Sequence, residues 1–186
     1  KLFDFEPNDL KAIKFNFLQQ RLFKKNKKKL THVSRIMKNK KDINVAFNRS
    51  TKIYFELQEY ALNEMRYRYM FPNDTLPDVD KSDREVYLEM QELDKNDSAF
   101  VAFVYRYSSK TRSEVNVEKA CIDAVGEKKA LRQIDRIGFL REHAIKNYLH
   151  VEKGIDSNRI RFGVLPPDSL KTNVSSHEYR LDFWVD

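Results

Sequence analysis

The sequence feature that most constrains the fold is a long run of apolar residues at helical spacing between positions 127 and 149. They recur every three or four positions, at Leu131, Ile134, Ile137, Leu140, Ala144, Ile145, Tyr148 and Leu149. A helix with one apolar stripe must bury that stripe against another element. Alternating apolar residues at 159–164 and 178–185 predict two strands after this helix. We therefore expect the helix to pack on a sheet.

Shorter patterns predict the remaining elements. Alternation predicts two earlier strands, at 2–6 and 43–47. Helical spacing predicts further helices at 9–23, about 30–37, 52–71 and 82–93. Residues 99–107 fit either a buried strand or a helix, and the cap residues before them favour the helix. The remaining segments, 72–83 and 108–116, read as an acidic loop and an exposed polar stretch.

Together these elements predict an α+β fold, with about four strands in a mixed sheet packed by helices. We expect one domain over 1–186, with a helical and acidic insertion at 52–125.

The net charge of +7 is unevenly distributed. Residues 1–52 carry 15 basic and 4 acidic side chains, residues 53–105 carry 5 and 12, and residues 106–186 carry 15 and 12. The excess centres on a basic patch, defined as Lys24, Lys25, Lys27, Lys28 and Lys29. One interpretation is a solvated helix C-terminus, where cations complement the helix dipole. The other is contact with acidic lipid head groups, acidic polymers or the chain's own acidic segment. Nucleic acid is not expected, because no binding motif accompanies the patch.

The sequence lacks the motifs of common catalytic and cofactor sites. Its four glycines are too far apart for a phosphate-binding loop, and its four histidines lack the His-x-x-x-His spacing of a zinc site. Cys121, the single cysteine, is expected to be a buried thiol. We therefore expect a non-catalytic protein without metal or cofactor. No apolar run reaches the roughly 20 residues that span a bilayer, and the start at Lys1 suggests a piece excised from a larger membrane-anchored protein.

The order of these elements and several short motifs resemble an OmpA-like domain, a two-layer sandwich. The opening residues 2–10 resemble the family's first strand and turn. Arg141, then Gly154-Ile155 and Arg159-Ile160, match its pattern of an arginine helix, a Gly-Ile turn and an Arg-Ile strand.

In members of this family that bind peptidoglycan, an aspartate after the second strand and the helix arginine hold the diaminopimelate group. Here residues 48–52 read Asn-Arg-Ser-Thr-Lys, without an aspartate. Only Arg141 is retained, and Asp135 or Glu142 would have to replace the missing acid. The resemblance therefore argues against peptidoglycan binding of the usual kind.

A closer resemblance is to the degenerate OmpA-like tail of large AsmA-like envelope proteins of Gram-negative bacteria. The matching features are a tyrosine-rich helix at 59–69, a Lys-x-Asp-Ser-x-Phe segment at 95–100 and the final long helix. This resemblance implies a periplasmic, non-catalytic interaction domain with a part in outer-membrane biogenesis or lipid transport. Its expected partner is an envelope protein or acidic lipid head groups at the basic patch. The alternatives are a peptidoglycan-anchoring domain that uses Arg141 and Asp135, and a basic nucleic-acid-binding domain.

Overall fold

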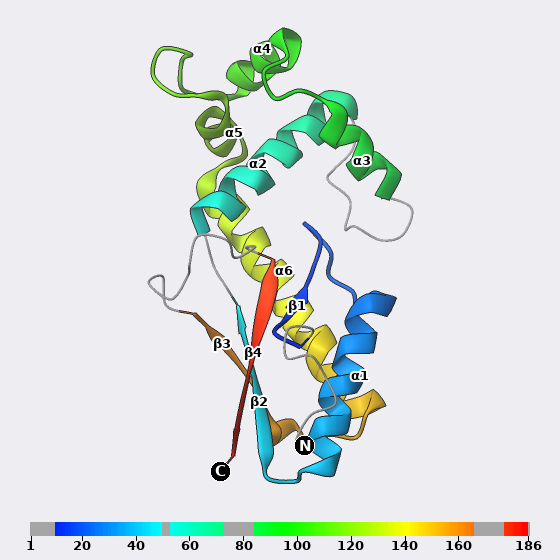
Figure 1. Ribbon diagram of the computed structural model, residues 1–186. Coiled ribbons are helices and arrows are strands. Elements are labelled where there is room, and N and C mark those ends of the chain that lie inside the picture. The colour runs from blue at the N-terminus through cyan, green and yellow to red at the C-terminus, as the bar shows by residue number, and fades with distance from the viewer. Residues whose placement is uncertain (1–9, 50–52, 73–83, 166–176, 186) are drawn as a thin grey trace. The chain divides into compact units, whose positions relative to one another are not determined.

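The computed structural model describes residues 10–49, 53–72, 84–165 and 177–185 (Figure 1). The chain divides into two compact units. The sheet unit comprises Lys1–Lys52 and Ile137–Asp186, and the helical unit comprises Ile53–Arg136. The helical unit covers the region of the expected insertion and extends past it. That the two units form a single domain stays a prediction.

The sheet unit contains a four-stranded mixed sheet in the order β1-β4-β2-β3. Its strands are β1 (Ala12–Lys14), β2 (Ile43–Arg49), β3 (Ile160–Val164) and β4 (Glu178–Val185). The central strand β2 pairs in parallel with β3, and β4 runs antiparallel to both β1 and β2. The predicted α+β class and the four-stranded mixed sheet are confirmed.

Two helical segments cover one face of this sheet. One is α1 (Lys24–Asn39), and the other is the end of α6 (Glu127–Asn147) with the π-helical turn η1 (Tyr148–Glu152) that continues it. A short 3-10 helix, η2 (Ser157–Arg159), leads into β3. Because η1 is π-helical, the final turn of the predicted long helix is wider than an α-helical turn. Gly154, with a positive φ of 65°, ends it where the Gly-Ile turn was expected.

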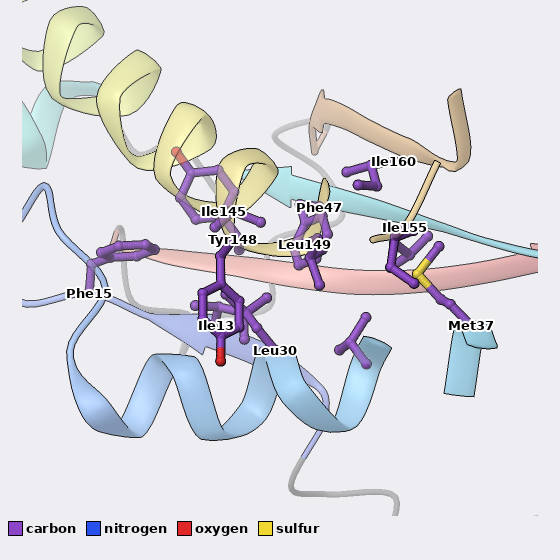
Figure 2. Packing of buried hydrophobic residues seen from close by; sticks show 13 residues of the cluster. Ile13, Phe15, Leu30, Met37, Phe47, Ile145, Tyr148, Leu149, Ile155 and Ile160 are labelled. Carbon is purple, nitrogen blue, oxygen red and sulfur yellow. The ribbon is translucent and has the colours of Figure 1, made fainter. Parts of the chain in front are cut away.

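The core of the sheet unit lies between α1, the end of α6 with η1, and the strands (Figure 2). The predicted stripe of α1 supplies Leu30, Val33 and Met37, all fully buried. The long helix and η1 supply buried Ile145, Tyr148 and Leu149. The strands complete the cluster with side chains that share one face of the sheet, Ile13, Val45, Phe47, Ile160 and Tyr179.

The helical unit is built from α2, α3, α4, α5 and the first part of α6. The bounds of the first four are Ile53–Met70, Arg84–Glu92, Ser98–Tyr107 and Val117–Val125. The helices predicted at 52–71 and 82–93 are confirmed, and the ambiguous segment at 99–107 is a helix. The helix α5 was not predicted. Its signals were present, because Asn116 caps its start and Gly126, with a φ of 89°, ends it.

The helix predicted at 9–23 is wrong. Residues 12–14 form β1, and α1 begins only at Lys24. Ile13, Phe15 and Phe17 are buried at alternate positions, which is strand periodicity, although Ile13 and Phe17 also fit a helical stripe. Pairing with β4, which places Ile13 opposite Tyr179, decides between the two patterns. The strand expected at 2–6 and the acidic loop at 73–83 lie outside the described residues.

Replacing Leu149 with alanine tests this core. Leu149 is fully buried, whereas Val151, two positions later, is 72% exposed. The Leu149→Ala variant is expected to lose about 3 kcal/mol of unfolding free energy in urea, because the removed side chain leaves a cavity. The Val151→Ala variant serves as the control and is expected to change it by less than about 0.5 kcal/mol. Equal losses in the two variants would contradict the register of η1.

Candidate functional site

Arg141, the retained arginine of the OmpA-like pattern, holds a loop of its own chain. Its side chain is buried, with 4% exposed. Its Nε donates a hydrogen bond to the carbonyl of Gln19 at 2.7 Å, and Nη2 donates to the carbonyl of Asn16 at 2.9 Å. Its guanidinium also lies 5.1 Å from the ring centroid of Phe15. The arginine therefore fixes the loop between β1 and α1.

Asp135, the acid proposed to accompany Arg141, is exposed on α6. Six residues turn a helix by about 600°, so the two side chains leave α6 in directions about 120° apart. One side chain is exposed and the other is buried against the loop that follows β1. Asp135 belongs to the helical unit and Arg141 to the sheet unit, so a ligand site that uses both residues stays a prediction.

A polar cluster lies where β2 ends, in the segment where the OmpA-like pattern has its aspartate. Arg49, the last residue of β2, lies so close to Gly138 of α6 that a Cβ there would overlap its guanidinium. The hydroxyl of Tyr179 donates to the carbonyl of Gly138 at 3.1 Å. Burial raises the pKa of the Glu142 carboxyl, and the charge of Arg49 opposes that rise. A cation from β2 and an acid from α6 thus face each other inside the sheet unit.

The basic patch lies at the N-terminal end of α1. The expectation that these lysines complement the dipole at a helix C-terminus is wrong, because α1 begins at Lys24 and has no acidic residue in its first turn. Cations at this end oppose the helix dipole, at a cost of about 0.3 to 1 kcal/mol each. Helix stability therefore gives no reason for their position.

The five lysines of the patch differ in their contacts. Lys27 pairs with Glu152 at 3.4 Å, and Nζ of Lys29 donates to the carbonyl of Ala12 at 3.1 Å. The other three, Lys24, Lys25 and Lys28, are exposed, and their side chains make no hydrogen bond or ion pair with any residue that the structure describes.

Further cations continue the exposed side of the helix. We define the outer face of α1 by its exposed cationic residues other than the ion-paired Lys27, namely Lys24, Lys25, Lys28, Arg35 and Lys38. The whole of α1 contains six lysines, one arginine and no acidic residue. Four of the five positions fall at helical spacings of four, seven and three, so they form one stripe along the helix. The outer face therefore presents positive charge over the length of α1.

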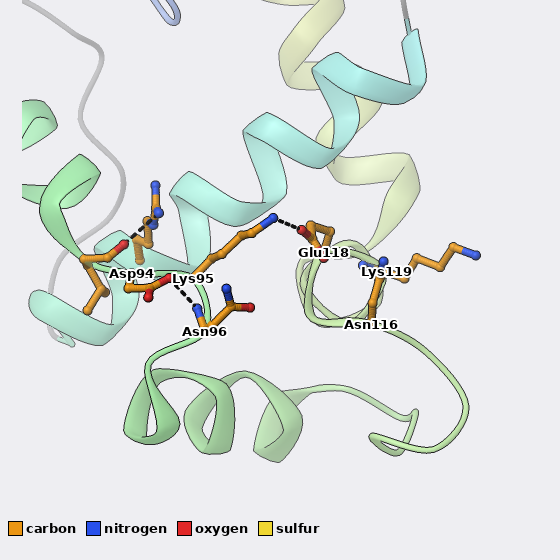
Figure 3. Close-up of polar contacts among 8 residues, drawn as sticks. Asp94, Lys95, Asn96, Asn116, Glu118 and Lys119 are labelled. Carbon is orange, nitrogen blue, oxygen red and sulfur yellow. Dashed lines mark hydrogen bonds and ion pairs between the residues drawn. The ribbon is translucent and has the colours of Figure 1, made fainter.

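The Lys-x-Asp-Ser-x-Phe segment at 95–100 has a structural role in the helical unit (Figure 3). Nζ of Lys95 pairs with Oε1 of Glu118 at 2.5 Å, and this contact lowers the pKa of the Glu118 carboxyl. Oδ1 of Asp97 accepts hydrogen bonds from the backbone at the start of α4, and Phe100 is fully buried. This segment ties the start of α4 to α5.

Cys121 is a buried thiol of the helical unit, as expected. Burial raises its pKa to about 12. Within residues 10–49, 53–72, 84–165 and 177–185, no group of three or more His, Cys, Asp or Glu side chains could hold a metal ion. No helix in the same part of the chain is long and apolar enough to cross a membrane.

Comparisons with family models, curated proteins and solved structures find no match to this chain. The OmpA-like and AsmA-like assignments therefore rest on the motifs in the sequence.

Replacing Arg141 with methionine tests its role in the fold. The change removes both hydrogen bonds to the loop carbonyls and is expected to lower the unfolding free energy by about 2 to 4 kcal/mol. Arg132 is exposed on the same helix. Its replacement by methionine is the control and should change stability by less than about 0.5 kcal/mol. A stable Arg141→Met variant would instead point to a role in ligand binding.

The environment of Cys121 predicts a thiol that does not react in the native protein. Because burial excludes reagents and raises the pKa to about 12, the reactive thiolate is scarce at pH 8. We expect a chromogenic thiol reagent to give no colour with the native protein and to detect one equivalent of thiol after unfolding. Rapid labelling of the native protein would show that Cys121 is accessible.

Proposed function

We propose that the chain is a non-catalytic interaction domain of the Gram-negative cell envelope, the OmpA-like tail of an AsmA-like protein. Its role would be in outer-membrane biogenesis or lipid transport, and it would bind an anionic partner through the outer face of α1. The observation that carries the binding proposal is the position of the exposed lysines at the positive end of the helix dipole.

The helix dipole and the side chains add to one another at this position. The first turn of α1 contributes about half a positive charge from its backbone. Lys24 and Lys25 occupy its first two positions and add two full charges, and Lys28 follows one turn later. An acid here would stabilise α1, yet the helix contains none. Binding of an anion provides the stabilising counter-charge that the chain itself omits.

The geometry favours this function over peptidoglycan anchoring. Arg141 donates to two carbonyls of its own loop, and Asp135 is exposed elsewhere on α6. No nucleic-acid-binding motif accompanies the basic patch in the sequence. Sequence-specific nucleic-acid binding is therefore not part of the proposal.

Reversing three charges on the outer face tests the proposal. The Lys24→Glu/Lys25→Glu/Lys28→Glu variant is expected to elute from a column of immobilised heparin, an acidic polymer, at much lower salt than the wild type. At low salt, the same variant is expected to gain stability, by about 0.3 to 1 kcal/mol for each of the two first-turn positions. Weaker binding by a more stable protein cannot result from unfolding.

A matched control variant distinguishes the effect of the outer face of α1 from the effect of the net charge of the protein. Lys110, Lys119 and Lys128 are exposed in the helical unit, and replacing all three with glutamate changes the net charge equally. We expect this variant to remain close to the wild type on the heparin column. Equal losses in both triple variants would mean that net charge, and not the outer face of α1, determines retention.

A further inference from the structure

Two apolar side chains project from the surface beside the basic patch. Phe23, the residue directly before α1, is 49% exposed, although its neighbour Leu22 packs against the core. Val151 in η1 is 72% exposed, more than any other large hydrophobic residue that the structure describes. The fold leaves both of these apolar side chains outside the core.

Direct contacts hold α1 and η1 together. The backbone N–H of Lys27 donates to the carbonyl of Phe23 at 3.0 Å, and Nζ of Lys27 lies 3.4 Å from Oε1 of Glu152, the neighbour of Val151. One turn further along α1, the hydroxyl groups of Thr31 and Tyr148 are 2.9 Å apart. Phe23 at the start of α1 and Val151 in η1 therefore lie on two segments that contact each other directly.

Two lysines lie near Tyr148 of η1. Nζ of Lys27 and Nζ of Lys153 lie 5.1 and 5.0 Å from the ring centroid of Tyr148. The acid Glu152 is paired with Lys27, so it does not offset the exposed lysines of α1. Exposed apolar side chains are thus set among positive charges.

We propose that the anionic partner is a bilayer surface containing acidic phospholipids, into which Phe23 and Val151 insert while the lysines contact the phosphates. This inference rests on the proposed function, because it names the partner of the same face. A bilayer offers a plane of negative charge with an apolar layer directly beneath it. An acidic polysaccharide or a nucleic acid offers the charge alone and leaves Phe23 and Val151 without a contact.

Insertion of Phe23 can be observed directly by fluorescence. Trp184 in β4 is the single tryptophan of the sequence. The guanidinium carbon of Arg161 lies 5.0 Å from the centroid of the Trp184 ring. In a Phe23→Trp/Trp184→Phe variant, the new tryptophan is expected to shift to the blue with vesicles of phosphatidylcholine and about one-third phosphatidylglycerol. Lipids brominated in their acyl chains should quench it. The wild-type Trp184 is the control and should not be quenched, and a failure of these lipids to quench the introduced tryptophan would overturn insertion.

Partition measurements then separate insertion from charge. The Phe23→Ser/Val151→Ser variant is expected to bind the acidic vesicles about tenfold more weakly and to elute from heparin like the wild type. Phe139 on α6 is 65% exposed, and its ring neighbour is His143, so Phe139→Ser is the matched control and should bind like the wild type.

The outcomes distinguish the two proposals. Unchanged vesicle binding by the Phe23/Val151 variant, with lost binding by the lysine triple variant, overturns the bilayer inference and leaves the anion-binding function standing. Binding of the wild type to duplex DNA, but not to the acidic vesicles, also overturns the bilayer inference. Retention of the lysine triple variant on heparin at wild-type salt overturns the proposed function itself.

Discussion

The burial of one side of α1 against the sheet determines how the sheet unit meets its surroundings. Leu30, Val33 and Met37 are fully buried in the cluster that contains Phe47 of the central strand. A helix held by this stripe can present only its opposite side to solvent, and that side carries the outer-face cations. The packing of α1 on the core thus directs the outer-face cations towards solvent. The same packing compensates for the helix stability that the first-turn lysines reduce.

The residues at the start of α1 are not those that helix N-termini prefer. Good helix starts carry Asp or Glu in the first turn, and this helix has lysines there instead. A buried side chain, Asn26, helps to tie the helix start to the sheet unit. Its Oδ1 accepts from the N–H of Phe23 at 3.0 Å, and its Nδ2 donates to the carbonyl of Lys14 at 2.7 Å. Such conflicts between local preference and fold are expected where a surface serves binding.

Much of the fold was predictable from periodicity, because the stripes of α1 and α6 and the alternation in β2, β3 and β4 are formed by neighbouring residues. The strand β1 was not, because Ile13 and Phe17 fit both periods and a partner strand distant in sequence decides between them. The same error placed the lysines at the wrong end of a helix. The motif located Arg141, but only its contacts with the loop after β1 reveal its structural role. The exposure of Phe23 and Val151 likewise depends on tertiary packing.

In the proposed binding mode, the first turns of α1 and the neighbouring η1 meet an anionic bilayer. The most direct measurement is amide NMR line broadening of the whole chain by anionic bicelles that carry a gadolinium-chelating lipid. We expect the strongest broadening at Phe23, Lys24, Lys25 and Val151, with weaker effects along α1 and little in the helical unit. Broadening that is strongest in the helical unit, or uniform along the chain, would contradict it.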